Sequence, residues 1–347
     1  MGRFLFLISV LAVLGLSGGM FFAGWQKTQS DRDSSIPAKR EVLASPVVRK
    51  CVNMGGALEA PREGDWGYTI EKSDFNKLKR AGFDSVRIPI KWSAHTAKSA
   101  PYQLDGAFAQ RIDQVVAEAL EADLKVIINV HHYDEINEKS EAHIPRLYAI
   151  WDQIIARYKN RSNKLIYEFL NEPHTDVTPA RVNKINRDLL QKVRASDPDR
   201  WVILGGGDWG TLDGLLKTNP PYDSRAMVTF HYYSPFEFTH QGAPWAHKKI
   251  AMGQTWGTTA DRKAIAEDMS RAARWRDKVG MPLLLGEFGV YTKVPDSQRA
   301  IWTNAVRQSA ESVGFGWCYW DYATSLAMYD QETATFRPGM LRALVGE

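Results

Sequence analysis

The sequence predicts a (β/α)8 barrel built as a single domain, because one rhythm repeats from Cys51 to the end of the chain. Short apolar or β-branched runs alternate with longer segments of helical spacing. The runs are almost continuously apolar, which is typical of parallel strands covered by helices. Eight such runs fit a barrel of roughly 300 residues. An open doubly wound sheet is the rival, but no G-x-G-x-x-G follows the first run.

The eight predicted strands lie in runs that share this apolar character. They are "CVNMGG" (51–56), "SVRIPI" (85–90), "KVIINVHH" (125–132), "KLIYEFLNEP" (164–173), "WVILGGGD" (201–208), "MVTFHYYSP" (227–235), "PLLLGEFG" (282–289) and "FGWCYWDY" (315–322). The intervening helices are clearest at 106–121, 147–158, 180–194 and 260–279. The helix after the fifth run is the weakest, and "GGGDWG" is expected to form a tight turn beside a substrate groove.

The N-terminus predicts export of the rest of the chain. Residues 4–25 carry no charge and are long enough to span a bilayer. Residues 1–25 are therefore either a cleaved signal peptide or a retained membrane anchor. Residues 26–48 are polar and irregular, as in a linker, and 49–347 form the folded domain. We expect this domain to be secreted, periplasmic or anchored to a membrane, outside the cytoplasm in each case.

Composition excludes some partners and leaves the cysteines open. Hydrophobic residues make up 44% and charged residues 24%, and the net charge of +4 is spread along the chain. No basic stripe follows a nucleic-acid backbone, so nucleic acid is not an expected partner. Cys51 and Cys318 show no metal-ligand spacing. Two buried free thiols are favoured, although a closed barrel would make the two residues neighbours and permit a disulfide.

Polar residues gather where six of the eight predicted strands end. Since the chemistry of such a barrel belongs at the carboxyl ends of its strands, this set predicts a site. Asp321 alone has a simpler explanation, as a helix cap or a satisfied polar group in the core. The set comprises Arg87, His131, His132, Asn171, Glu172, His231, Tyr233, Glu287, Trp320 and Asp321.

Glu172 and Glu287 predict the chemistry, because the fourth and seventh strands face each other across a barrel. Two carboxyl groups aimed at one cleft are the tools of glycosidic-bond hydrolysis, one protonated and the other ionised. We expect Arg87 and Tyr233 to favour the charged form of Glu287, whose charge would raise the pKa of Glu172. Asn171 is expected to bind a sugar hydroxyl, and Trp320 to stack on a sugar ring.

The stretch "HHYDE" (131–135) also suggests metal ligands, but it matches no recurring metal spacing. Neighbouring residues of a strand point to opposite faces, so only one of His131 and His132 is expected to enter the site. Asp134 and Glu135 are expected in a loop, and 138–141 at the solvated surface. We therefore predict no metal and no cofactor. No G-x-S-x-G elbow supports a serine nucleophile.

At these residues the sequence resembles glycoside hydrolase family 5, the β-1,4-glucanase and mannanase group, over about residues 50–345. The resemblance rests on seven motifs in order: "NMGGALEAPREGDWG", "VRIPIKW", "INVHHYDE", "EFLNEPH", "HYYSPFEFTHQGA", "LLGEFG" and "WCYWDY". It implies that Glu172 is the acid/base and Glu287 the nucleophile. It also implies substrate contacts, which are expected at Arg87, His131, Asn171, His231, Tyr233, Trp320, Glu59 and Trp245. Gly56 departs from the family pattern, in which Asn is common, and this puts affinity or substrate preference in doubt.

The sequence therefore predicts a retaining endo-β-1,4-glucanase, or cellulase, that cuts cellulose-like or mixed-linkage β-glucans. An endo-β-mannanase or glucomannanase with the same mechanism is the alternative. A non-catalytic polysaccharide-binding protein at a cell surface belongs to a different class, but the presence of both carboxylates disfavours it. Transglycosylation passes through the same covalent intermediate and stays open. We expect a monomer whose partner is the polysaccharide, with a possible membrane tether through residues 4–25.

Overall fold

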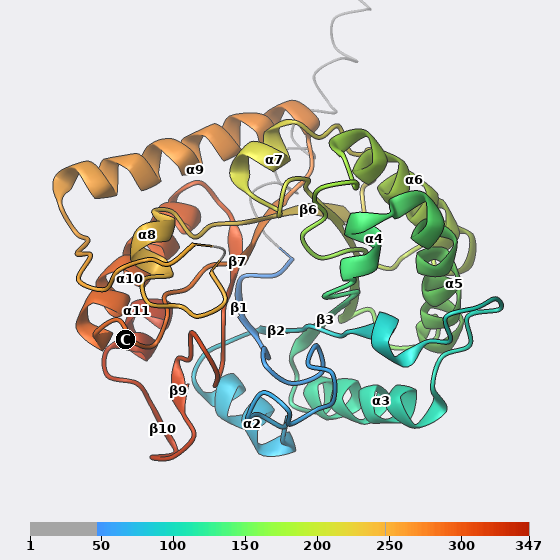
Figure 1. Ribbon diagram of the computed structural model, residues 1–347, viewed down its shortest axis with the longest axis horizontal. Helices are drawn as coiled ribbons and strands as arrows, with labels where there is room; N and C mark the ends of the chain where they lie inside the picture. The colour runs from blue at the N-terminus through green and yellow to red at the C-terminus, as the bar shows by residue number, and fades with distance from the viewer. Residues whose placement is uncertain (1–46, 247, 347) are drawn as a thin grey trace, which may run out of the picture. The chain divides into compact units, whose positions relative to one another are not determined.

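The computed structural model describes residues 47–246 and 248–346 (Figure 1). The predicted signal or anchor (1–25) and nearly all of the linker (26–48) lie outside these residues. Within the part that is described, none of the helices has the length and apolar character needed to cross a bilayer.

Eight parallel strands close into a barrel in the order of the sequence, and β8 pairs with β1. The predicted fold is confirmed. The strands are β1 (Lys50–Asn53), β2 (Ser85–Ile88), β3 (Lys125–Asn129), β4 (Leu165–Glu168), β5 (Val202–Gly205), β6 (Ala226–His231), β7 (Leu283–Glu287) and β8 (Gly316–Tyr319). A small hairpin of β9 (Tyr329–Asp330) and β10 (Thr335–Phe336) follows β8.

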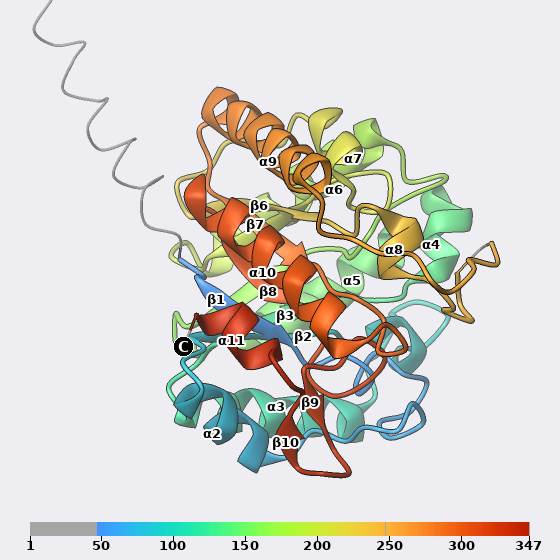
Figure 2. The same cartoon turned by 90° about the vertical axis from the view of Figure 1, so that its left-hand side faces the viewer.

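Helices surround the barrel, and short elements occupy the loops at its carboxyl end (Figures 1 and 2). The surrounding helices are α2 (Lys72–Arg80), α3 (Gly106–Glu121), α5 (Ser140–Tyr158), α6 (Pro179–Ser196), α7 (Leu212–Leu216), α9 (Thr259–Val279), α10 (Asp296–Ser312) and α11 (Met340–Val345). The short elements are η1 (Trp92–His95), α4 (Asp134–Glu138) and α8 (Phe236–Thr239).

The predicted helices are present, with differences at their ends. α3 has the predicted bounds, because Asp105 caps its first turn by accepting a hydrogen bond from Phe108 N. α5 begins at Ser140 rather than 147 and contains Pro145, which lies near its start. Asp134 and Glu135 were predicted in a loop but begin α4. α7 spans only five residues, as its weak sequence pattern indicated.

The lower end of the barrel interior holds a separate apolar cluster, which we call the lower layer. It consists of Val48, Cys51, Ile127, Ile166, Ile203, Met227, Leu284 and Cys318. Cys51 and Cys318 are register partners on the strands that close the barrel, and they form a disulfide. The favoured prediction of free thiols is therefore wrong, because barrel closure brings the first and last strands into direct contact.

Candidate active site

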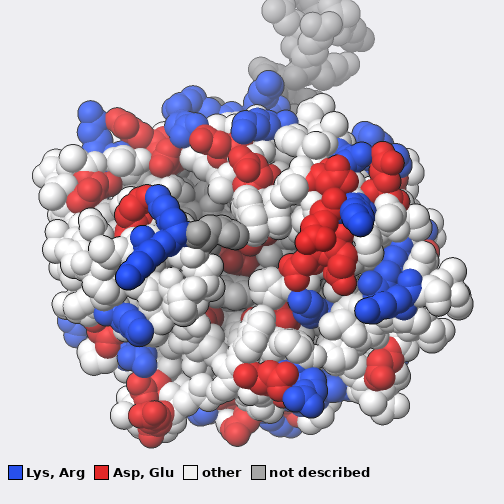
Figure 3. All heavy atoms as spheres, in the orientation of Figure 1, with Lys and Arg blue, Asp and Glu red and all other residues white. Residues whose placement is uncertain are grey.

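The site lies at the carboxyl end of the barrel, where Figure 3 shows the face hollowed near its centre with acidic atoms in the hollow. Its floor is formed by interior side chains two residues beyond the lower layer on their strands, since successive side chains of a strand alternate between faces. These side chains are Asn53, Asn129 and Glu168, which lie two residues after Cys51, Ile127 and Ile166. Each of the three polar residues is buried. We call these three residues and Arg87 the polar layer.

Arg87 on β2 is the centre of the polar layer, and its guanidinium is fully buried. Nε and Nη2 donate to the two carboxylate oxygens of Glu168 at 2.6 and 2.7 Å. Nη1 donates to Asn53 Oδ1 at 2.8 Å and to Glu287 Oε1 at 2.7 Å. Nη2 also donates to Asn171 Oδ1 at 2.8 Å. A buried charge needs this degree of pairing. The planar guanidinium of Arg87 therefore fixes the positions of its four hydrogen-bond partners.

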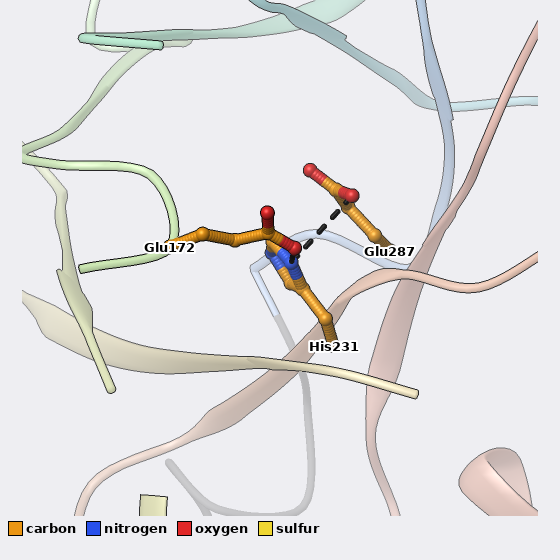
Figure 4. A group of neighbouring side chains, drawn as sticks. All are labelled: Glu172, His231 and Glu287. Atoms are coloured by element: carbon orange, nitrogen blue, oxygen red, sulfur yellow. Dashed lines mark hydrogen bonds and ion pairs between the residues drawn. The ribbon is translucent and has the colours of Figure 1, made fainter. Parts of the chain in front are cut away.

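Glu172 and Glu287 approach each other from opposite walls, with His231 between them (Figure 4). His231 Nδ1 lies 2.7 Å from Glu172 Oε1 and 3.5 Å from Glu287 Oε2. One oxygen of each carboxylate and the His231 nitrogen all lie within 4.8 Å of one another. Tyr233 Oη donates to Glu287 Oε2 at 3.0 Å. Arg87 and Tyr233 thus contact Glu287 as expected from the sequence.

The backbone helps to aim Glu172 into the hollow. Glu172 has a φ of 43°, in the left-handed region that a residue with a side chain seldom adopts. This residue ends the apolar run, and Pro173 N carries no hydrogen that could continue the strand pairing. The side chain of Glu172 keeps 25% of its surface exposed, against 5% for Glu287. Glu172 is therefore the carboxyl group nearer to solvent.

The pKa directions differ from the sequence expectation, and His231 is the cause. Burial alone would raise the pKa of Glu172, but the hydrogen bond and charge of protonated His231 lower it. The pKa of Glu287 is raised because burial outweighs the charges of His231 and Arg87. Burial opposes protonation of His231, yet Glu287 and Glu172 together raise its pKa. The prediction of a raised pKa for Glu172 is corrected for the free protein, because the hydrogen bond and charge of His231 outweigh burial there.

Two histidines and an indole form the wall beside β3 and β8. The rings of His131 and Trp320 are stacked, with centroids 5.5 Å apart and planes at 12°. Burial holds the pKa of His131 well below its usual value, so its ring is neutral. Asn129 Nδ2 lies 3.1 Å from His131 Nδ1, which places the ring hydrogen on Nε2.

His132 also lies beside the site, contrary to the expectation that only one of the two histidines would. It follows the end of β3 and has a φ of 48°, so strand alternation no longer governs its direction. Its ring meets that of His131 edge to face at 4.5 Å. Burial lowers the pKa of His132, and the Glu172 charge acts in the opposite sense.

Asp321, and Glu59 and Trp245, which the family resemblance placed at the substrate, have their contacts elsewhere than at the carboxylate pair. Asp321 is buried and accepts hydrogen bonds from Thr324 and from Leu326 N, so it is a satisfied core group. Glu59 is 1% exposed and binds backbone amides of its own loop. Trp245 lies at the rim, 46% exposed, with its ring edge against Tyr291 at 4.8 Å.

The described residues contain one group with metal-ligand geometry, which is Glu172, His231 and Glu287. Its nitrogen and one of its carboxylates are already engaged with each other, and Arg87 is paired with Glu287. A cation there would have to displace these contacts. The absence of a metal and of a cofactor stays a prediction.

Comparisons with known proteins show the family of this chain. The sequence model of the family described as "Cellulase (glycosyl hydrolase family 5)" matches residues 50–325 of this chain. The chain belongs to glycosyl hydrolase family 5. It is therefore a glycoside hydrolase of the cellulase type, built on the (β/α)8 barrel that the sequence predicts.

Relatives within family 5 are similar over most of this chain. Endoglucanase H of Acetivibrio thermocellus is 36% identical over 90% of the chain, which spans only 35% of that relative's length. A hyperthermophilic endo-β-1,4-glucanase solved in complex with substrate is 38% identical, with a TM-score of 0.85 and coverage of 86% of this chain and 97% of that one. Thermotoga maritima Cel5A, solved with mannotriose, is 37% identical with a TM-score of 0.83, covering 89% and 99%.

Sequence reasoning missed the polar layer of this family 5 enzyme apart from Arg87. Glu168 was read only as part of an apolar run, although a charged residue inside such a run is itself a signal. Asn53 and Asn129 lie two residues beyond Cys51 and Ile127 on their strands, so period-two alternation places them inside the barrel as well.

Proposed function

We propose that this family 5 enzyme is a retaining endo-β-1,4-glucanase acting on cellulose-like or mixed-linkage β-glucans. One observation carries the proposal: the facing oxygens of Glu172 and Glu287 lie no more than 4.8 Å apart. Retaining glycosidases hold their carboxyl groups about 5–5.5 Å apart, whereas inverting enzymes need about 6.5–9.5 Å to admit a water. The short separation favours direct attack by a carboxylate on the sugar.

Glu287 is the proposed nucleophile. Arg87 and Tyr233 each bind one of its oxygens, which stabilises the anion and fixes its orientation. In the first step a Glu287 oxygen bonds to the anomeric carbon, and the glycosidic bond breaks. In the second step water attacks the same carbon, and the bond to Glu287 breaks, which regenerates the carboxylate.

Glu172 is the proposed acid and then base, and His231 is its proton partner. In the free protein the raised pKa of His231 and the lowered pKa of Glu172 favour a proton on His231, whose Nδ1 lies 2.7 Å from Glu172 Oε1. Bound sugar excludes water, and the proton must then pass to Glu172 and on to the leaving oxygen. Formation of the glycosyl bond neutralises Glu287, which lowers the pKa of Glu172 and suits it to take a proton from the attacking water.

The residues around the pair supply contacts for the sugar. Arg87 occupies Asn171 Oδ1, so the Asn171 amide hydrogens are available for a sugar hydroxyl. His131 offers Nε2–H, and Trp320 offers a flat apolar face. An amide, a neutral imidazole and an indole are suited to the neutral hydroxyls and ring faces of a sugar, which fits an uncharged polysaccharide.

Exposed tryptophans on the carboxyl-end loops support internal cleavage of a long chain. Trp66 follows β1, Trp209 follows β5, and Trp245 follows β6; their exposed fractions are 48%, 41% and 46%. Each ring contacts a histidine: His132, His174 and His240 respectively. Sugar platforms away from the reacting bond favour polymers over short oligosaccharides.

We also propose that the domain works outside the cytoplasm. The apolar N-terminal stretch supports export, and so does the Cys51–Cys318 disulfide, because disulfides persist in oxidising compartments. Whether residues 4–25 remain as a membrane tether and whether the protein is a monomer stay predictions.

Mannan or glucomannan is the second candidate substrate, with the same mechanism. It is favoured by one observation, the mannotriose complex of Thermotoga maritima Cel5A. The two substrates differ in the orientation of one hydroxyl on each sugar, and both fit the roles given to Glu172 and Glu287.

The experiment that tests the proposal is reducing-sugar release from soluble cellulose derivative, mixed-linkage β-glucan, glucomannan, galactomannan and xylan. Glu287→Gln should lower the rate by about 10³-fold or more, as in other enzymes that lose a nucleophile. Glu121→Gln, a surface glutamate paired with Lys72, is the matched control and should keep full activity.

The outcomes separate the candidates. Release mainly from glucans, with an initial product of retained anomeric configuration by NMR, supports the proposal. Release mainly from mannans moves the substrate and keeps the mechanism. An inverted product contradicts the nucleophilic role of Glu287. No release by the folded protein favours the polysaccharide-binding alternative.

A further inference from the structure

Glu59 is a buried carboxylate that the catalytic mechanism does not use. It lies in the loop 54–60 between β1 and α2, with 1% of its surface exposed. One carboxylate oxygen accepts a hydrogen bond from Gly56 N, and the other accepts from Ala57 N at 3.1 Å. Both oxygens are therefore occupied within the loop, and a direct sugar contact would require that the loop give them up.

The backbone that Glu59 holds is the wall behind Trp320. A Cβ placed on Gly55 would lie 3.0 Å from Trp320 Cζ2 and 3.2 Å from Asp321 Cβ, so the loop backbone packs directly on the indole. The next residue, Gly56, has a φ of 80°, and a Cβ there would lie 2.3 Å from Thr324 Cγ2. The loop thus fits against the end of β8 only in a narrow range of positions.

We propose that Glu59 is a positioning residue, whose carboxylate holds the Gly56 and Ala57 amides so that loop 54–60 sets the sugar-stacking indole of Trp320. This inference rests on the proposed function, because it assigns Trp320 to the sugar. Without the carboxylate, two buried amides lose their acceptors and the loop must shift to satisfy them. Trp320 would then lose the wall against which it is held.

The same contacts make the positioning dependent on pH. Burial raises the pKa of Glu59 to about 7; the three backbone amides that it faces, of Gly56, Ala57 and Glu59, act against this, and the Asp321 charge adds to it. The carboxylate form, which accepts from both amides, is therefore present above about pH 7 and is lost as the pH falls through this value. Substrate affinity should follow the same direction.

The test compares Glu59→Gln with wild type, using cellotetraose and soluble β-glucan at about pH 6 and about pH 8. Glutamine keeps the size of the side chain but offers only one acceptor oxygen. Glu63→Gln is the matched control, since Glu63 lies in the same connection and also binds a backbone amide, that of Ile70, but pairs with Arg111 and has no bond to the amides of Gly56 and Ala57. Thermal melting shows whether each variant is folded.

At about pH 8 we expect KM to rise about fivefold in Glu59→Gln, with kcat within about twofold of wild type. At about pH 6 the difference should shrink, because the wild-type carboxylate is then protonated. Glu63→Gln should match wild type at both pH values. A purely structural role would lower the melting temperature without this pH-dependent change in KM.

Calorimetric binding of cellotetraose, measured with Glu59→Gln in the Glu287→Gln background, separates this inference from the proposed hydrolysis. If wild type releases no sugar but binds cellotetraose more tightly than Glu59→Gln, the hydrolysis fails and the role of Glu59 stands. An unchanged KM and affinity in folded Glu59→Gln overturns the role of Glu59, and so does absence of binding by both proteins. If Glu59→Gln does not fold, a wild-type affinity that is flat between about pH 6 and 8 overturns it equally.

Discussion

Two layers of the same barrel interior differ in chemistry although they lie only two residues apart on β1, β3 and β4. In the lower layer, Cys51, Ile127 and Ile166 pack as an apolar plug. In the polar layer, Asn53, Asn129 and Glu168 surround Arg87. Period-two geometry places both sets inside the barrel, so position alone does not decide the composition. The lower layer stabilises the fold by burial, whereas the polar layer is stable only while every charge is paired and positions groups for catalysis.

The largest test of this contrast removes the charge at the centre of the polar layer. Arg87→Met should lower the free energy of unfolding by about 3–5 kcal/mol, because the carboxylates of Glu168 and Glu287 would stay buried without their cation. Activity should be lost as well. Denaturant unfolding and β-glucan hydrolysis measure the two effects.

The matched variant is Arg87→Met with Glu168→Leu, which removes the ion pair as a whole. It should recover part of the stability but none of the activity. Equal stability of the single and double variants would contradict the view that unpaired charge is what destabilises the polar layer.

The second test removes the disulfide of the lower layer. Replacing both Cys51 and Cys318 by Ala should lower the free energy of unfolding by about 3 kcal/mol, since the disulfide closes a loop with a sequence separation of 267. The rate of hydrolysis at moderate temperature should be nearly unchanged, because the catalytic groups lie on the layer above. A loss of activity in the folded variant would show that the two layers are coupled.

The third test uses pH to isolate the pair of His231 and Glu172. The pKa of Glu172 is lowered from 4.5, so its contribution to stability is present above that value and is lost as pH falls through the folded pKa. The pKa of His231 is raised from 6.5, so its contribution is complete below that value and is lost as pH rises through the folded pKa.

Wild type should therefore exceed His231→Asn in stability mainly between pH 4.5 and 6.5, by about 2 kcal/mol. Urea unfolding at several pH values measures the difference. Asp261→Asn, which alters a capping carboxylate on α9, serves as a control for ordinary acid effects. A constant difference from acidic to alkaline pH would show that His231 acts through packing rather than charge.

The smallest effect is expected from a methyl group in the lower layer. Ile127→Val should cost about 1 kcal/mol by removing apolar contacts inside the barrel, with kcat and KM unchanged. Differential scanning calorimetry and steady-state kinetics check this. A change in KM as large as that expected for Glu59→Gln would remove the distinction between the two layers.

Particular residues show how far the sequence predicts this structure. The eight apolar runs located the strands, and the asparagine, glutamate and histidine residues at their ends located the site, since barrel geometry maps chain order to space. The same patterns did not predict the pKa directions, because these depend on the His231 nitrogen lying 2.7 Å from Glu172. The family resemblance implied a substrate contact at Glu59, and the bonds of its carboxylate to two backbone amides were not predicted because they arise from the fold of the loop. The direction of His132 was missed for a similar reason, a left-handed residue just after the strand.

The disulfide also has a mechanical consequence. A pull on the chain that precedes Val47 would load β1, the first strand of the barrel. Cys51 is the second residue of that strand and is covalently joined to β8. Separation of β1 from β8 would therefore stop after Lys50. The disulfide would pass the force to β8, and the pairing of β1 with β8 that closes the barrel would stay intact. A force applied at the start of β1 would therefore leave the carboxyl end of the barrel, where the candidate site lies, in its folded shape.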